Sequence, residues 1–220
     1  PPRRRAYVHI PPSGASRLPF AKHNHDPTIV ACPAAQGGGL LASWFSTACG
    51  EPGRCTGLVS ARLEDDHEAW TTAEVDLDVA DRCQCCPSFL LDRTRGVLYQ
   101  FSAMTPAGDW SGFYSGLMGI VRWSTDCGRT WNADGPRVIW PAHGVSHQVV
   151  VTALRSERTG EVLIPTDHWG PTADPYDYCF TTKCDQTVIQ HAPSTSDVPN
   201  PSKWRLAPPG ANQSIFGFGY

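Results

Sequence analysis

The stretch Ser124-Thr125-Asp126-Cys127-Gly128-Arg129-Thr130-Trp131 carries the pattern S-x-D-x-G-x-T-W once in full. These residue types suit a tight turn between two strands. The carboxylate of Asp126 is able to accept hydrogen bonds from backbone and hydroxyl groups of the turn, and Gly128 allows a left-handed backbone. The indole of Trp131 is suited to packing between neighbouring sheets. We therefore expect Ser124, Asp126, Gly128 and Trp131 to have structural and not catalytic roles.

The sequence on either side of this turn is divided into three similar units. In each unit a glycine precedes a short apolar segment, further apolar segments lie before and after it, and a tryptophan follows. The glycines are Gly39, Gly96 and Gly160, and the tryptophans are Trp70, Trp131 and Trp204. With 20 Gly and 20 Pro among 220 residues, long helices are not expected. Four short strands per unit, the last opened by the tryptophan, are typical of a β-propeller blade.

The pattern at Ser124–Trp131 resembles the Asp-box, or BNR repeat, of the sialidase-like β-propellers. Ser60–Trp70 and Ser194–Trp204 occupy the equivalent places in degraded form, so the resemblance covers nearly the whole chain. It implies an all-β fold of radial four-stranded antiparallel blades, six or seven in a complete ring. About three blades are present here, and three do not close a ring. We therefore expect this chain to be the N-terminal half of a longer propeller.

The units give the expected domain organisation. The whole chain, residues 1–220, is treated as a single partial propeller. The expected parts are 1–22 as a lead-in or closing strand, 23–80 as the first blade, 81–142 as the second, 143–209 as the third and 210–220 as the start of a fourth.

Composition narrows the cellular setting and the partners. The net charge of −3 argues against a nucleic-acid groove, and no apolar run is long enough for a membrane span. Nine cysteines suit an oxidising compartment, and we expect a secreted or cell-surface protein. Cys49–Cys55 and Cys179–Cys184 are the expected loop disulfides. The group Cys83, Cys85 and Cys86 is interpreted as structural thiols or disulfides in preference to zinc ligands.

Strand direction predicts which face is functional. If the Asp-box joins the third strand of a blade to the fourth, the connections between blades and from second to third strands lie on the opposite face. Long loops on one face of a rigid scaffold are where binding and catalysis usually occur. The innermost strands are expected to begin at His25-Asp26, Cys85-Cys86 and Ser146-His147. The candidate site residues on this face are His23, His25, Asp26, Trp110, Tyr114, His147, His168 and Trp169.

At the first of these positions sialidases carry an Arg-Ile-Pro motif, where this chain has His25-Asp26-Pro27. The stretch His-Asn-His-Asp-Pro-Thr, with Leu40-Leu41-Ala42-Ser43-Trp44 after it, is similar to polysaccharide lyases that cut rhamnose–glucuronate linkages on a seven-bladed propeller. This resemblance implies β-elimination with a histidine base. The implied catalytic residues are His25, His147, His168 and Asp26. The implied substrate-binding residues are Trp110, Trp169, Tyr114 and His23.

A lyase of this kind also needs positive charge beside the uronate carboxylate. A divalent cation such as calcium in the central channel would supply it, and so would an arginine from other blades. The expected partner is an acidic polysaccharide or glycoconjugate. Two alternatives stay open, a sialidase-type exo-glycoside hydrolase and a non-catalytic propeller that binds glycan or protein. Asp26 either orients His25 or caps the turn before Pro27.

Overall fold

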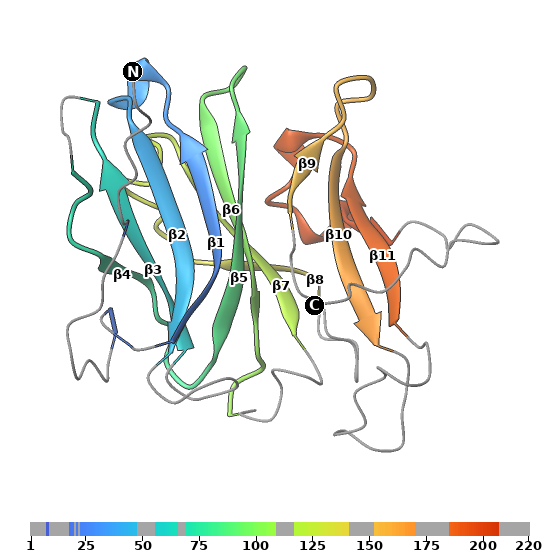
Figure 1. The fold of residues 1–220 in the computed structure, drawn as a ribbon. Coiled ribbons are helices and arrows are strands. Elements are labelled where there is room, and N and C mark those ends of the chain that lie inside the picture. The colour runs from blue at the N-terminus through green and yellow to red at the C-terminus, as the bar shows by residue number, and fades with distance from the viewer. Residues whose placement is uncertain are drawn as a thin grey trace.

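The computed structural model describes residues 8, 18–19, 21, 23–47, 56–65, 69–108, 117–140, 152–169 and 185–206, with only the backbone described at 167–169, 185–188 and 206. These residues form three four-stranded antiparallel sheets that lie side by side (Figure 1). In each sheet the spatial order of the strands follows the chain. The predicted all-β fold of consecutive blade-like sheets is confirmed.

The strands have the following bounds. The first sheet contains β1 (His23–Ala31), β2 (Leu40–Thr47), β3 (Thr56–Leu63) and β4 (Glu74–Leu77). The second contains β5 (Gln84–Asp92), β6 (Val97–Met104), β7 (Met118–Ser124) and β8 (Arg137–Trp140). The third contains β9 (Leu154–Arg155), β10 (Val162–Trp169), β11 (Asp185–Ala192) and β12 (Arg205–Leu206).

Helical structure in the described part of the chain is limited to three short 3-10 segments. These are η1 (Ala34–Gln36), η2 (Thr195–Asp197) and η3 (Pro201–Lys203). None of the helices among the described residues is long and apolar enough to cross a membrane.

The fourth strands of the first two sheets begin later than the sequence predicts. Trp70 and Trp131 lie ahead of β4 and β8, in the connections that lead to those strands. The reason is that these tryptophans pack against apolar clusters and do not pair in a strand: Trp70 packs against Ala42, Trp44 and Val59 of its own sheet. Trp131 packs against the Cys32–Leu41–Leu98 cluster between the first two sheets. Trp204 lies edge-on to Trp140 at 5.2 Å, in the core between the second and third sheets.

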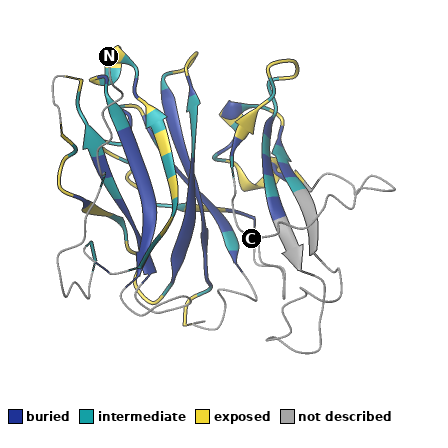
Figure 2. Cartoon of the chain, in the orientation of Figure 1, coloured by how far each residue is buried: buried dark blue, intermediate teal, exposed yellow. Residues whose placement is uncertain are grey.

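Burial is greatest in the middle of each sheet. β6 is buried along its whole length and β2 along nearly all of it, whereas β1 alternates between half-buried and exposed positions (Figure 2). β1 also contacts β5, so the two innermost strands of the first and second blades are neighbours. The exposed character of β1 leaves side chains of the innermost strand open to solvent.

The turn at Ser124–Trp131 is held by side-chain hydrogen bonds. Asp126 accepts from the Thr130 backbone N–H at 2.8 Å and from the hydroxyls of Thr130 and Ser124, each at 2.6 Å. Gly128 has φ +75°, and a Cβ there would lie 2.8 Å from Leu41 of the first sheet. The turn therefore packs against the preceding blade too closely for a side chain at this glycine.

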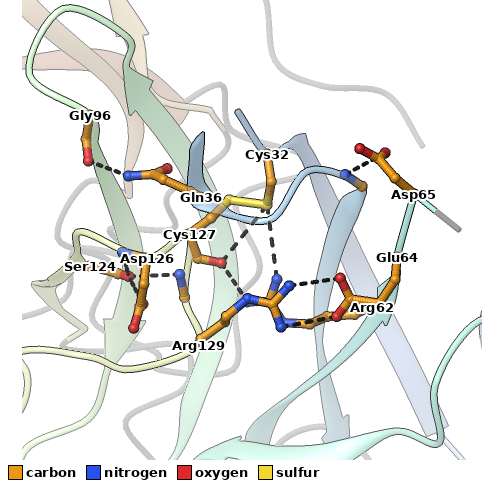
Figure 3. Close-up of a disulfide and its surroundings, with 12 residues drawn as sticks. Cys32, Gln36, Arg62, Glu64, Asp65, Gly96, Ser124, Asp126, Cys127 and Arg129 are labelled. Atoms are coloured by element: carbon orange, nitrogen blue, oxygen red, sulfur yellow. Dashed lines mark hydrogen bonds and ion pairs between the residues drawn. A yellow bond between two sulfur atoms is a disulfide. The ribbon is translucent and has the colours of Figure 1, made fainter. Parts of the chain in front are cut away.

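A disulfide links this turn to the first blade. Cys32, just after β1, is bonded to Cys127 with a Cα–Cα distance of 5.8 Å (Figure 3). Arg62 of β3 donates a hydrogen bond to the Cys127 carbonyl. The Arg129 guanidinium contacts both carboxylate oxygens of Glu64, at 3.0 and 2.7 Å. The two blades are therefore joined by a covalent bond and by charged contacts at one end.

The predicted pairs Cys49–Cys55 and Cys179–Cys184 lie outside the described residues, whereas the Cys32–Cys127 bond was not expected from spacing. A topological signal could have found it. Cys32 falls between the first and second strands of its unit, and Cys127 falls between the third and fourth strands of the next unit. By sequence position, the other seven cysteines fall inside strands, between second and third strands, or between units. The connections that hold Cys32 and Cys127 share one face of the blades, so these two cysteines have only each other to pair with there.

A buried ion pair also joins the first two sheets. Asp76 of β4 contacts the Arg122 guanidinium of β7, and both side chains are less than a tenth exposed. The same guanidinium lies 4.0 Å from the Trp131 ring centre, and its Nε donates to Gln100 at 2.6 Å. Asp76 in turn accepts from the Trp131 indole N–H at 3.1 Å. Removing either charge would leave the other one buried without its partner.

Candidate functional site at the start of β1

Two histidines begin β1 on the same face of the sheet. His23 and His25 are two residues apart, so their side chains project to one side of the strand. Their rings lie 5.8 Å apart at an interplanar angle of 23°, and both contact the Phe45 ring, at 6.1 and 5.5 Å. Phe45 is fully buried. The buried phenylalanine ring therefore provides an apolar surface that both imidazoles contact.

Asn24, between the histidines, anchors the strand from the opposite face. Its amide nitrogen donates to the Ala21 carbonyl at 3.0 Å. Its amide oxygen accepts from the Trp44 indole N–H at 2.9 Å. These two hydrogen bonds fix the backbone that carries His23 and His25, which limits how far the rings can move.

A β-bulge follows immediately. His25 pairs with Phe45 and Thr28 with Ser43, so Asp26 and Pro27 together stand opposite a single residue of β2. Asp26 has φ +49°, a left-handed conformation that Asp tolerates better than most residues. The proline has no N–H to place in the ladder, which suits a bulge. Bulges re-aim side chains, and here the strand direction changes just after His25.

The Asp26 carboxylate, in the bulge, contacts the imidazole of the preceding residue, His25. Asp26 Oδ1 lies 2.9 Å from His25 Nδ1, and the two side chains are 38% and 45% exposed. Because a carboxylate only accepts, this contact assigns the proton to Nδ1. In the neutral form of an imidazole with its proton on Nδ1, the lone pair is on Nε2. A neutral imidazole oriented by a carboxylate is the arrangement used for general-base catalysis. Of the two roles predicted for Asp26, the contact favours orienting His25.

The second blade carries the same bulge in β5. Cys85 pairs with Ala103 and Ser88 with Phe101, so Cys86 and Pro87 stand opposite one residue of β6. Cys86 has φ +55°. The sequences His-Asp-Pro-Thr and Cys-Cys-Pro-Ser are thus structurally equivalent, as the predicted strand starts implied. One scaffold feature presents an imidazole–carboxylate pair in the first blade and a pair of thiols in the second.

The two bulges meet in one cluster. Cys85 and Cys86 are buried with Phe45, Ala103 and Leu117. Burial raises the pKa of the Cys86 thiol well above its ordinary value, and hydrogen bonds to Cys85 and to Asp26 raise it further. Cys86 is therefore a protonated thiol at neutral pH and not a nucleophile. Sequence reasoning did not assign Cys86 or Phe45 to the site, although the repeated X-X-Pro-[Ser/Thr] pattern pointed to Cys86.

The remaining predicted residues are placed less completely. Trp110, Tyr114 and His147 lie outside the described residues. His168 and Trp169 end β10, where only the backbone is described, and pair with Gln186 and Asp185 of β11. Among the described side chains, no group of three or more His, Cys, Asp or Glu residues is arranged to hold a metal ion.

The site and the Ser124–Trp131 turn lie at opposite ends of the blades. His23 pairs with Thr47 at the end of β2, whereas Ala31 pairs with Leu40 at its start, next to Cys32 and its bond to Cys127. Asp126 is next to Cys127 and therefore lies at the far end of β1 from His25. Asp126 therefore shapes the turn that carries Cys127, away from the histidines.

Comparison with known proteins identifies the fold. No protein-family profile matches this sequence, and no curated protein matches it. The structure is similar to an intramolecular trans-sialidase from Ruminococcus gnavus (TM-score 0.61, 11% identity, 88% of this chain and 62% of that one). It is also similar to a NanB sialidase variant from Streptococcus pneumoniae (0.60, 8%, 88% and 45%). A third is a sialidase from Trypanosoma rangeli in complex with sialic acid (0.53, 14%, 86% and 30%).

These similarities show a sialidase-like β-propeller fold. The chain spans less than two thirds of the length of each of these three structures.

Proposed function

We propose that this protein acts on acidic glycans and that His25, oriented by Asp26, is the general base of a β-elimination. The observation that carries the proposal is the 2.9 Å contact between His25 Nδ1 and Asp26 Oδ1 at the start of the innermost strand. Two of the proteins with a similar fold have names that refer to a trans-sialidase and to a sialidase in complex with sialic acid, and sialic acid is an acidic sugar. Fold similarity at this low identity supports the class of substrate only as an analogy.

The proposed reaction is the cleavage of a uronate-containing polysaccharide. His25 Nε2 takes the proton from the carbon beside the uronate carboxylate. The electron pair of that C–H bond forms a carbon–carbon double bond as the bond to the glycosidic oxygen breaks. The leaving oxygen takes a proton from water or from a second acid. The products are an unsaturated uronate and a new free hydroxyl end, so atoms and charge balance without an oxidant or a reductant.

The environment of His25 suits this role. Histidine is the side chain that enzymes use most often as a general base. The Phe45 ring under His25 restricts the orientation of the imidazole, and Asp26 stabilises the imidazolium that forms on proton uptake. Predicted sugar contacts from Trp110, Trp169, Tyr114 and His23, and participation by His147 and His168, belong to the same proposal.

A sialidase-type exo-glycoside hydrolase is the second candidate. It is favoured by the named sialidases among the similar folds. The first blade favours the lyase, because His25-Asp26-Pro27 stands where sialidases carry an arginine for the substrate carboxylate. In either case we propose that the working protein contains further blades and is secreted. We also propose that it binds an acidic polysaccharide or glycoconjugate.

The deciding experiment compares products. The protein is incubated with glucuronate-containing polysaccharides and, separately, with sialylated glycans. The lyase proposal predicts ultraviolet absorbance from an unsaturated uronate, lost in His25→Ala and strongly reduced in Asp26→Asn. His191→Ala is the matched control, because His191 lies in β11 near Glu161 and is outside this site.

Free sialic acid without ultraviolet absorbance would establish the hydrolase instead. Glycan binding by a protein that forms neither product would indicate the non-catalytic alternative. Full activity in a folded His25→Ala protein would overturn the role assigned to this histidine in any of these reactions.

A further inference from the structure

We propose that Cys32 is a thiol-exchange site, at which a low-molecular-weight thiol opens the bond to Cys127, and that Arg62 makes Cys32 the reactive cysteine of the pair. A site of this kind lets the covalent link between the first two blades open and close reversibly. It lies at the end of the blades opposite His25 and is independent of the proposed function.

The guanidinium of Arg62 lies beside the sulfur of Cys32 (Figure 3). Its Nη1 contacts Cys32 Sγ at 3.9 Å, and its Nη2 donates a hydrogen bond to the Cys127 carbonyl. Arginine keeps its positive charge in proteins, and a positive charge beside a cysteine favours the thiolate over the thiol. Arg62 therefore stabilises the Cys32 thiolate that forms when the bond is reduced.

The other charges near Arg62 have partners of their own. They are those of Arg129, Glu64, Asp126 and Asp76. The Arg129 guanidinium is paired with the Glu64 carboxylate at 2.7 Å. Asp126 accepts hydrogen bonds within its own turn, and Asp76 is paired with a second arginine, Arg122. The charge of Arg62 is thus the one that contacts the Cys32 sulfur directly.

The contact between Arg62 and Cys32 lies within one blade, so it does not depend on the disulfide. Cys32 follows β1, and Arg62 belongs to β3 of the same sheet. The Cys32 N–H donates to the Gly39 carbonyl at 2.9 Å. The Arg62 N–H donates to the Thr71 hydroxyl, also at 2.9 Å. These hydrogen bonds hold both residues in place after Cys127, in the second blade, is released.

The released Cys127 also stays close to its partner, because other contacts join the two blades at this end. Gln36 of the first blade donates from Nε2 to the Gly96 and Thr125 carbonyls of the second, each at 2.6 Å. Both cysteines also pack in one apolar cluster between the blades. Reduction removes the covalent link and leaves these contacts, so the two sulfurs remain positioned to rejoin.

Exposure decides which sulfur is attacked first. Cys32 is 9% exposed, whereas Cys127 is completely buried. A small thiolate therefore attacks Cys32 Sγ and forms a mixed disulfide there, while Cys127 leaves and takes a proton from water. A second thiolate then attacks the outer sulfur of the mixed disulfide, and Cys32 leaves as the thiolate that Arg62 stabilises. Two reduced cysteines and one low-molecular-weight disulfide result, so atoms and electrons balance, with the added thiol as the reductant.

The first experiment locates the mixed disulfide. The full chain is incubated briefly with glutathione, quenched with acid, digested without further reductant and analysed by mass spectrometry. We expect glutathione on Cys32 and a free thiol at Cys127. A mixed disulfide found mainly on Cys127 would overturn the proposal, and so would a bond that glutathione opens only when the protein is unfolded.

The second experiment tests Arg62. The full chain is reduced, and the rate at which iodoacetamide alkylates Cys32 is measured against pH. Arg62→Met removes the charge, Arg62→Gln removes it but keeps a donor for the Cys127 carbonyl, and Arg62→Lys keeps the charge. Arg129→Met is the matched control, because it removes a guanidinium from the same end of the blades. Circular dichroism checks that each variant is folded.

We expect wild-type Cys32 to reach half its maximal alkylation rate below about pH 8.5, the midpoint of a free cysteine. In Arg62→Met and Arg62→Gln this midpoint should rise by about one pH unit. The rate at pH 7 should fall about threefold, because less thiolate is present but the remaining thiolate is more nucleophilic. Arg62→Lys should keep most of the wild-type rate, and Arg129→Met should leave it unchanged.

An unchanged midpoint in a folded Arg62→Met or Arg62→Gln protein would overturn the role assigned to Arg62. An equal shift in Arg129→Met would also overturn it, because the effect would then come from the overall charge of this end of the blades. If the methionine variant does not fold, the glutamine and lysine variants decide the question.

Discussion

The Asp126 carboxylate shows how one residue can make the stability of a turn depend on pH. Burial opposes its ionisation, but hydrogen bonds from Ser124 and Thr130 outweigh that effect and lower the pKa of Asp126. A lowered carboxyl pKa in the folded state stabilises the fold above the unfolded pKa of about 3.9. This contribution is lost as the pH falls through the lower, folded-state pKa.

Replacement of Asp126 by alanine should therefore lower the free energy of unfolding at pH 7 by about 1–3 kcal/mol. The difference from wild type should shrink as the pH falls below about 4 and through the lowered folded-state pKa, because the folded wild-type carboxyl then takes up a proton and loses its charge. Urea denaturation at both pH values measures this. Asp134→Ala is the control, since Asp134 is 81% exposed in the same connection. Equal effects of the two substitutions would contradict the role assigned to Asp126.

At the scale of the elements, the Cys32–Cys127 disulfide connects residues 95 apart in the sequence. Closing a loop of this length restricts the unfolded chain and typically contributes 2–4 kcal/mol. The double variant Cys32→Ser/Cys127→Ser should lose about that much, measured by urea denaturation without reductant. Peptide mapping of a non-reduced digest checks the pairing itself, and recovery of Cys32 or Cys127 joined to a different cysteine would show that the pairing is wrong.

The Asp76–Arg122 ion pair makes a second prediction at this scale. Arg122→Met leaves the buried Asp76 carboxylate without its partner and should cost about 3–5 kcal/mol. Asp76→Asn in the Arg122→Met background removes the orphaned charge and should recover part of that loss. A double-mutant cycle gives the coupling between the two side chains. Additive effects of the two substitutions would mean that the pair contributes little to the contact between the sheets.

For the whole molecule, the apolar surface of the first sheet is the relevant feature. Ile29 and Val75 are 57% and 46% exposed, and their pairing with Ala42 and Val59 puts them on the side of the sheet with Trp44. We expect the isolated 220-residue chain to self-associate through this face. Ile29→Lys/Val75→Lys should shift sedimentation toward the monomer, whereas the same change at exposed Arg93 and Glu157 should not. A monomeric wild-type chain would contradict the expectation.

The fold was largely predictable because its signals are local. Glycines, short apolar segments and a tryptophan recur in each blade, and each constrains the backbone near itself. The fourth strands were predicted too early because Trp70 and Trp131 were interpreted as strand residues, although they are positioned by packing against other parts of the fold. The Cys32–Cys127 bond is a contact between blades, which spacing along the chain does not reveal.

The site was predictable only as far as one strand determines it. His25 and Asp26 are adjacent in sequence, so their pairing needed only the correct strand start and the proline after it. Phe45 and Cys86 reach the site from β2 and from a different blade, so the sequence could place them near His25 only once the register of the sheets was known. Blade boundaries within 1–220 and the roles of His147, His168, Trp110, Trp169 and Tyr114 stay predictions.

The separation between the disulfide end and the histidine end of β1 has a practical consequence for immobilisation. Ala35, in the turn next to Cys32, is exposed and lies at the opposite end of β1 from His25. A peptide tag inserted there would attach the protein to a solid support with the candidate site facing the liquid. On a biosensor surface built this way, the molecules would all have the same orientation. A large soluble polymer would then reach the histidines, which would not be so if the molecules were attached in random orientations.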